Sequence, residues 1–223
     1  MMSDNRLELY FHIPFCVKKC DYCDFLSAPG SEKKMEQYME ALFMETAGRA
    51  KDHRLDTVST IFIGGGTPSA LPYGCIGALL EQAREHFWLA SDAEITVEAN
   101  PGTLSPRILS GFLEAGVNRL SIGLQSADNG LLASIGRIHT WEQFEDNFRL
   151  AREMGFRNIN VDLMSGLPGQ SYFQYRDTLE KVLGLKEPPE HISAYSLILE
   201  ESTPLYDRYR EGRLSLPDED TER

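Results

Sequence analysis

Six short apolar segments recur along the chain, and most intervals between them leave room for a helix. The segments are rich in Ile, Val, Leu or Tyr and are bounded by Gly, Pro or Asn, which is typical of β-strands. They cover residues 7–13, 57–63, 94–99, 118–124, 158–164 and 191–199. Strands that alternate with helices join through right-handed crossovers, so the pattern predicts a mostly parallel sheet.

Helical patterns fill the intervals between these predicted strands. The clearest is 33–51, where apolar side chains recur at three- and four-residue steps and form one largely apolar face. Ser105 before Pro106 is a second start signal, because a serine N-cap followed by proline at the first helical position favours a helix. The other predicted helices are 74–87, 105–115, 141–154 and 173–185.

Distinctive residues cluster at the ends of the predicted strands. Three cysteines follow the first strand, GGGTP the second, EANPG the third and Gln125 the fourth, while Asp162 and GLPGQ lie at the fifth. An open doubly wound sheet sets its strand ends in a row, whereas a barrel brings them together at one mouth. We therefore predict an α/β fold with a partial (βα)6 TIM-like barrel.

Composition limits the domain organisation and the class of partner. The 223 residues, 42% hydrophobic and 25% charged, suffice for one sizeable core, and no repeat or linker divides them, so we expect a single domain over 1–223. Six βα-type strands fall short of a full barrel, which suggests a fragment of a longer protein that lacks a C-terminal domain. A net charge of −12 argues against a nucleic-acid partner.

The sequence also gives expectations about the cellular compartment. It contains no run of about 18 apolar residues that could span a bilayer, and its first residues do not resemble a secretory signal. Clustered cysteines in an unexported protein are more often metal ligands than disulfides. We expect a cytoplasmic protein with no transmembrane segment.

Cys16, Cys20 and Cys23 fall within eight residues directly after the first predicted strand. Three thiolates on one loop can hold an iron–sulfur cube and leave one iron without a protein ligand, so that this iron can chelate another molecule. Structural zinc would need a fourth ligand, for which His12 is close in sequence. Cys75 stands apart and is interpreted as an ordinary packing thiol.

The segment CVKKCDYC resembles the signature loop of radical S-adenosylmethionine (SAM) enzymes. In order and spacing, the segments YFHIPFC, FIGGGTPS, ITVEANPG, SIGLQS, GRIH, NVDLMSGLPGQ and HISAYSLILEESTP resemble the oxygen-independent coproporphyrinogen III oxidase family. The resemblance covers Leu7 to about Leu216 and implies a radical SAM core domain. It also implies a [4Fe–4S] cluster on the three cysteines, and SAM that binds the open iron and is cleaved on reduction to a 5′-deoxyadenosyl radical.

Positions that match the family imply the residues that contact SAM. They are Tyr10, Tyr22, Gly65, Gly66, Thr67, Glu98, Gln125, Arg137 and Asp162. The residue types suit that role, since glycines allow close backbone approach, carboxylates bind hydroxyls or ammonium, and amides and guanidinium bind carboxylates. Ordinary structural roles stay open: a tight turn for the glycines, a solvated edge for Glu98, the surface for Arg137, and packing for both tyrosines. His12 and His139 are assigned no catalytic role.

One departure separates two branches of this family. The decarboxylating oxidases tend to carry a fourth cysteine two positions past the triplet, whereas here Cys23 is followed by Asp24 and Phe25. The CDF ending resembles the heme chaperone branch, which binds heme and passes it to target proteins. We therefore expect a heme chaperone with heme, heme-accepting proteins and an electron donor as partners. The alternatives are an oxidase that acts on porphyrinogen and a non-catalytic zinc-binding module.

Overall fold

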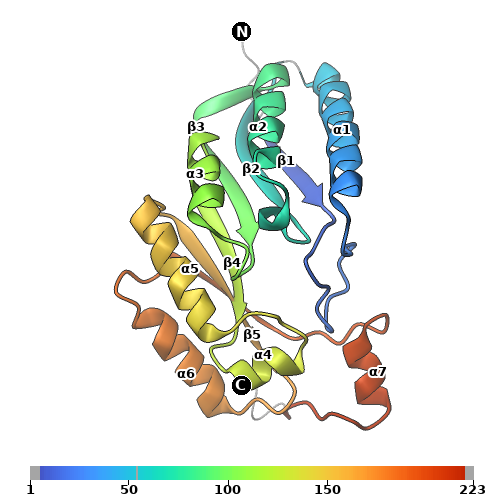
Figure 1. Ribbon diagram of the computed structural model, residues 1–223, viewed down its shortest axis with the longest axis vertical. Helices are drawn as coiled ribbons and strands as arrows, with labels where there is room; N and C mark the ends of the chain where they lie inside the picture. Colours follow the sequence, from blue (N-terminus) through green and yellow to red (C-terminus); the bar gives the residue numbers. More distant parts are fainter. Residues whose placement is uncertain (1–5, 54, 219–223) are drawn as a thin grey trace.

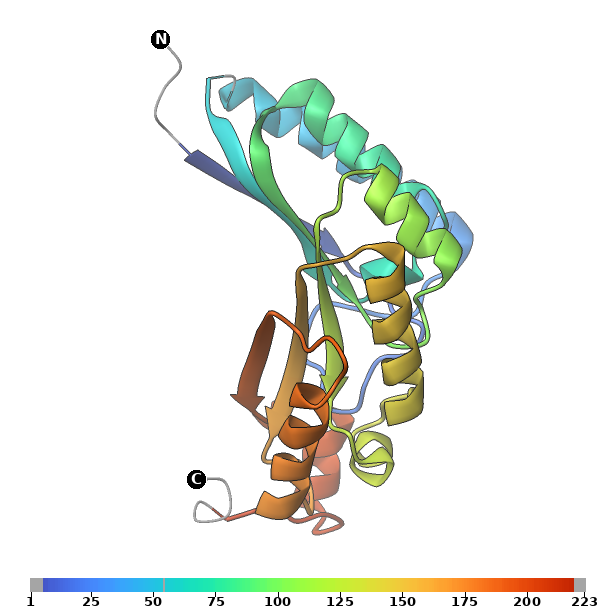
Figure 2. The same ribbon diagram turned by 90° about the vertical axis from the view of Figure 1, so that its left-hand side faces the viewer.

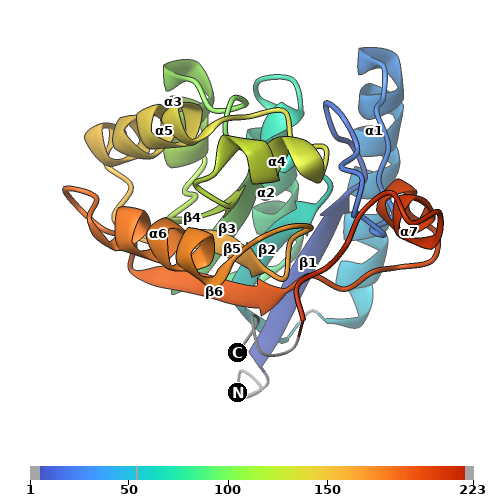
Figure 3. The same cartoon turned by 90° about the horizontal axis from the view of Figure 1, so that it is seen from below.

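A curved parallel sheet forms the centre of the structure, a computed structural model that describes residues 6–53 and 55–218. Its strands are β1 (Arg6–Ile13), β2 (Thr57–Gly65), β3 (Trp88–Ala99), β4 (Arg119–Gln125), β5 (Ile159–Ser165) and β6 (His191–Ser196). They pair in sequence order, each parallel to the next. β1 and β6 do not pair with each other, so the sheet is an open arc (Figure 3). The predicted α/β partial barrel is confirmed.

Helices cover one face of this sheet and leave the other face bare (Figures 1 and 2). The helices are α1 (Glu32–Arg49), α2 (Cys75–His86), α3 (Pro106–Glu114), α4 (Asn129–Ser134), α5 (Trp141–Met154), α6 (Tyr172–Leu183) and α7 (Pro204–Arg210), with 3-10 turns at Ala50–Asp52 and Pro68–Ala70. Among the described residues, none of these helices is both long enough and apolar enough to cross a bilayer.

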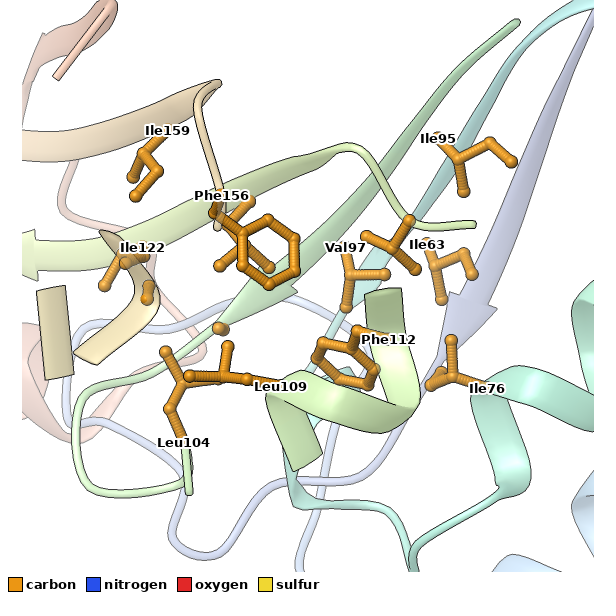
Figure 4. Close-up of a cluster of buried hydrophobic side chains, with 14 of the residues drawn as sticks. Ile63, Ile76, Ile95, Val97, Leu104, Leu109, Phe112, Ile122, Phe156 and Ile159 are labelled. Atoms are coloured by element: carbon orange, nitrogen blue, oxygen red, sulfur yellow. The ribbon is translucent and has the colours of Figure 1, made fainter. Parts of the chain in front are cut away.

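The hydrophobic core lies between the sheet and its helices because strand side chains alternate between two faces. Alternate residues of each central strand are Ile, Val or Leu and point toward the helices; Val97, Leu120, Ile122 and Val161 are fully buried there. Figure 4 shows part of this core, in which Phe112 and Leu109 from α3 pack against the strand side chains.

The opposite face of the same strands is polar. Glu98, Ser121, Asn160 and His191 are neighbours across β3 to β6, and the next row includes Asp162 beside Ser193. Their hydrogen bonds run across the strands, as from Asn160 Nδ2 to Ser121 Oγ at 2.8 Å. A sheet with one apolar and one polar face explains both where the helices pack and where a ligand can bind.

Local signals account for where several helices begin. Ser105 caps α3 ahead of Pro106, as predicted, with its side chain accepting a hydrogen bond from the Ile108 N–H at 3.3 Å. α5 and α6 both begin with a capping box, formed by Thr140 with Gln143 and by Ser171 with Gln174.

The structure differs from the sequence prediction most clearly at two strands and two short helices. β3 begins at Trp88, six residues before the predicted start, because the exposed first half of this strand lacks a clear apolar alternation. β6 ends at Ser196, before the apolar residues 197–199. The short helices α4 and α7 were not predicted, since six or seven residues are too few to show a helical period.

Truncation of a core side chain tests this packing. Phe144 on α5 is fully buried, and Phe144→Ala should lower the free energy of unfolding by about 3–5 kcal/mol through lost burial and a cavity. Phe173→Ala on α6 is the matched control, because that ring is 74% exposed and its loss should cost far less. Urea denaturation of both variants gives the comparison; equal losses would contradict the assignment of the core.

Candidate functional site

The polar face of the sheet and the loops after its strands enclose a cavity of about 690 Å³. All three predicted cysteine ligands line it, together with eight of the nine predicted SAM-contacting residues: Tyr22, Gly65, Gly66, Thr67, Glu98, Gln125, Arg137 and Asp162. Its size lies in the range of small-molecule and cofactor sites. Residues far apart in the sequence therefore meet at one place, as the strand-end pattern predicts.

The cysteine loop, residues 14–28, is fastened to the end of β1. The Ala28 N–H donates to the Pro14 carbonyl at 3.0 Å, and the Cys16 N–H donates to the Ala28 carbonyl at 3.2 Å. Cys23 is further held by its own N–H, which donates to the Cys20 carbonyl at 3.2 Å. The backbone thus closes into a compact loop that carries its three thiols toward the cavity.

The three thiols are free and partly buried. Burial raises the pKa of the Cys23 thiol, and the Ser27 hydroxyl lies 3.9 Å from its sulfur. No three His, Cys, Asp or Glu side chains in residues 6–53 and 55–218 are close enough together to hold a single metal ion. Three thiols around one cavity can hold an iron–sulfur cluster, which is larger than one ion.

Arg137 lies beside Cys20 and is partly buried. Its guanidinium donates to Asn100 Oδ1 at 2.7 Å, to the Gly123 carbonyl, and to Cys20 Sγ at 3.6 Å. Among the described residues, its Nε is the buried side-chain nitrogen that has no hydrogen-bond partner. The guanidinium therefore places a positive charge beside one of the three predicted cluster ligands.

The glycines of GGGTP are required by the protein's own packing. A Cβ at Gly66 would lie 2.6 Å from the Phe15 carbonyl oxygen, and Gly65 has a φ of +110°, which favours glycine. The N–H groups also serve the fold: Gly66 donates to Ile13, and Thr67 to Phe15, at 2.8 and 2.7 Å. These N–H groups are therefore occupied, so a ligand at this turn meets carbonyl oxygens and Cα atoms.

Two carboxyl groups, Glu98 and Asp162, face the cavity. Glu98 Oε2 accepts from the Gly65 N–H at 3.0 Å, while Asp162 Oδ1 accepts from Asn160 at 2.7 Å. Burial raises the pKa of both carboxyl groups. Buried carboxylates in a polar cavity can bind hydroxyl or ammonium groups of a ligand, which would offset the unfavourable desolvation.

Gln125 ends β4 in a conformation that side chains rarely adopt. Its φ is +71°, the β4–β5 register shifts beside it, and the residue is 4% exposed. Its Oε1 accepts from the Tyr195 hydroxyl at 3.1 Å, and burial raises the pKa of Tyr195 to about 12. The strained backbone directs the Gln125 amide into the cavity. Backbone strain of this kind often occurs at functional sites.

Tyr10 lies outside the residues that line the cavity. It is on the same sheet face, stacked against Phe62 with ring centroids 6.1 Å apart, and its hydroxyl donates to His12 Nδ1 at 3.2 Å. His12 Nε2 in turn donates to the Leu26 carbonyl at 2.9 Å. His12 therefore links β1 to the cysteine loop, and a contact between Tyr10 and SAM stays a prediction.

Sequence reasoning missed further polar residues that line the same cavity. Arg119 at the start of β4 donates to Thr96 Oγ1 at 3.3 Å and to His191 Nδ1 at 2.9 Å. The other missed lining residues include Asn100, Ser121, Asn160, Ser193 and Tyr195. Polar residues at every second position of β4, β5 and β6 indicate this polar face of the sheet. The apolar residues between them obscured that pattern in the sequence.

The residues present fit the iron–sulfur cluster and SAM that the resemblance implies. Free thiols from one loop line the cavity, and the Arg137 guanidinium, whose buried Nε has no hydrogen-bond partner, adjoins one of them. The carboxyls of Glu98 and Asp162 and the amide of Gln125 provide polar groups for a ligand with an ammonium, a carboxylate and a ribose.

Known proteins resemble this chain over most of its length. The Radical SAM superfamily matches residues 10–182. The heme chaperone HemW of Lactococcus lactis is 42% identical over 219 residues, which cover 98% of this chain and 56% of that protein. HemW of Bacillus subtilis is 41% identical over 214 residues, 96% of this chain and 56% of that one. The chain therefore spans about half the length of these curated relatives.

A solved structure resembles the fold as well. Coproporphyrinogen III oxidase (HemN) from Escherichia coli, described as a radical SAM enzyme, superposes with a TM-score of 0.86 at 31% identity. The match covers 98% of this chain and 50% of that chain. The two kinds of relative correspond to the two branches that the sequence resembles.

Buried His139 gives a pH-dependent stability. Its Nε2 donates to the Leu124 carbonyl at 3.2 Å, and burial, assisted by Arg137, lowers its pKa from 6.5 to about 3. Below pH 6.5 the unfolded chain binds a proton that the folded chain does not. Stability should therefore fall by up to about 1.4 kcal/mol per pH unit as pH decreases from 6.5 toward 3.

The measurement is urea denaturation at pH 7.5 and pH 5.5. His139→Gln keeps an N–H donor for the Leu124 carbonyl but does not titrate, so its stability should fall by about 1 kcal/mol less than that of the wild type between these pH values. His86→Gln, on the exposed surface of α2, should behave like the wild type. An unchanged pH dependence in His139→Gln would show that His139 is not buried in its neutral form.

Proposed function

The chain belongs to the radical SAM superfamily, and on that basis we propose that it is the cluster-bearing and SAM-binding part of a heme chaperone. Two relatives, at 42% and 41% identity to this chain, are heme chaperones. Cys16, Cys20 and Cys23 would hold a [4Fe–4S] cluster in the cavity. The bound cluster would supply an open iron for SAM and an electron for its cleavage.

The chain's own residues would bind and shield these groups. Arg137 keeps positive charge against the Cys20 thiolate, while Glu98 and Asp162 accept hydrogen bonds from hydroxyl or ammonium groups. Tyr22 and Phe62 add apolar surface that limits access of water to the cavity. The proposed contribution of the protein is positioning and exclusion of water, with no acid–base step.

The pair Asp24–Phe25 is the reason for proposing a heme chaperone and not an oxidase. Both residues line the cavity at the position where an oxidase-like sequence places a further cysteine. Asp24 Oδ1 accepts a hydrogen bond from the Ser202 hydroxyl, which ties this end of the loop to the segment before α7. Phe25 is 67% exposed, so its ring presents an apolar surface beside the cavity. Such a surface suits a large planar macrocycle such as heme.

The second candidate function is oxidative decarboxylation of a porphyrinogen. The structural match to coproporphyrinogen III oxidase at a TM-score of 0.86 supports it, because the same cavity could generate a radical. Both candidates use the same cluster ligands, and they differ in what happens to the tetrapyrrole.

We also propose a cellular compartment and partners for the protein. Three free thiols that serve as ligands persist in a reducing compartment, so we place the protein in the cytoplasm. A reduced cluster needs an electron donor, and delivery of heme needs a heme-accepting protein. Residues 1–223 are proposed to act as one radical SAM core domain.

Cys20→Ser tests the ligand assignment. After anaerobic reconstitution, the wild type should contain iron and acid-labile sulfide and show cluster absorbance, whereas Cys20→Ser should lose most of both because serine is a poor ligand for iron. Cys75→Ser, a change to a partly buried thiol on α2, should retain the cluster. One zinc per wild-type chain without sulfide would instead support the zinc-binding alternative.

Heme binding and porphyrinogen turnover separate the two candidate functions. Under anaerobic conditions with SAM and a reductant, the full-length protein should bind heme stoichiometrically and leave coproporphyrinogen III unchanged. Absorbance titration measures the first, and chromatography of the oxidised tetrapyrroles measures the second. Substantial formation of protoporphyrinogen IX would overturn the chaperone proposal. Phe25→Ala should weaken heme binding, with Phe173→Ala as the control for loss of an exposed ring.

A further inference from the structure

Asp21 stands between two of the cysteines and is held from four sides, although it does not line the cavity. Its N–H donates to the Ile135 carbonyl at 3.0 Å, and its carbonyl accepts from the Leu205 N–H at 2.9 Å. Its carboxylate Oδ2 lies 3.3 Å from Arg208 Nη1. The centre of the cysteine loop is thus fixed by segments that are distant in the sequence.

The fourth contact of Asp21 is the close packing of Gly136 against it. A Cβ at this position would lie 2.5 Å from Asp21 Oδ1 and 2.9 Å from the Asp21 N, and its φ of +77° also favours glycine. The backbone after α4 therefore approaches Asp21 as closely as the absence of a side chain permits. This glycine is the first residue of the GRIH segment, whose arginine contacts Cys20.

Arg208 joins the same loop to two helices. It lies on α7, and its Nη1 also donates to the Ser134 carbonyl at 2.9 Å, at the end of α4. α7 is itself anchored, because Leu205 is fully buried in a second hydrophobic cluster with Leu131, Ile135, Met164 and Leu167. Tyr22 packs against this cluster from the cysteine loop. The Arg208 guanidinium is thus held beside Asp21 by a helix that is anchored in this hydrophobic cluster.

We propose that Asp21 and Arg208 are a positioning pair that holds the cysteine loop in its ligand-bearing shape and balances charge beside the cluster. This inference rests on the cluster assignment in the proposed function. Asp21 directly follows Cys20 in the sequence, and Arg208 neutralises its carboxylate in a partly buried ion pair. Local charge is one of the factors that set the reduction potential of an iron–sulfur cluster, so the pair affects redox behaviour as well as loop shape.

The two partners have opposite effects on the potential. Arg208→Gln leaves the Asp21 carboxylate unbalanced, so the cluster should become harder to reduce and its midpoint potential should shift to a more negative value. Asp21→Asn leaves the guanidinium unbalanced, so the potential should shift to a more positive value. The double variant Asp21→Asn with Arg208→Gln removes both charges and should return the potential toward the wild type.

Both single variants and the double variant should loosen the loop. Iron release to a chelator should become about three- to ten-fold faster, the range expected for loss of one partly buried, charge-assisted hydrogen bond. Arg210→Gln removes the same charge from the exposed side of α7 and should leave both the potential and the release rate unchanged. Redox titration followed by electron paramagnetic resonance gives the potentials.

A measurement on the cluster-free protein keeps this test separate from the proposed function. Without a cluster, Cys20 and Cys23 should react faster with a maleimide in Arg208→Gln than in Arg210→Gln, with Cys75 as the internal reference. If the wild type assembles no cluster, the proposed function fails while the alkylation rates still test the pair. The pair is overturned if these rates match those of Arg210→Gln, or if both single variants shift the potential in the same direction.

Discussion

Alternation of strand side chains between two faces is the constraint on which the rest of this structure depends. One face of β2 to β5 is apolar and fully covered by helices, whereas the other carries Glu98, Ser121, Asn160 and Asp162. Because all six strands are parallel, their carboxyl ends meet at the same edge, and the loops that follow them close the cavity. A single pattern in the sequence thus produces both the core and the site.

The cavity combines charges that would be unfavourable without a ligand. The Nε atom of Arg137 is buried and has no hydrogen-bond partner, while burial raises the pKa of Glu98 and of Asp162. Groups of this kind are stabilised by partners of opposite charge or by hydrogen bonds. An amino-acid-like ligand beside metal-bound thiolates would provide both. The electrostatics of the cavity therefore agree with the cofactors that the radical SAM superfamily implies.

Local patterns in the sequence predicted most of the fold, because strands, caps and cysteine spacing depend on nearby residues. Ser105 and Pro106 marked the start of α3, and the three cysteines marked the loop. Residues that act through distant contacts were not predictable in this way. Asp21 is paired with a residue 187 positions away, and nothing near Arg208 in the sequence indicates this partner.

The hydrogen bonds from Gly66 to Ile13 and from Thr67 to Phe15 have a consequence for how this site can be moved between proteins. The start of the cysteine loop and the GGGTP turn are separated in the sequence by the whole of α1. Even so, the N–H groups of the turn satisfy carbonyl groups at the start of the loop. A cysteine loop transplanted without GGGTP would arrive with two unsatisfied carbonyls and without the space that Gly66 leaves for the Phe15 carbonyl. The smallest transferable unit is therefore the β1–α1–β2 unit with both of its loops.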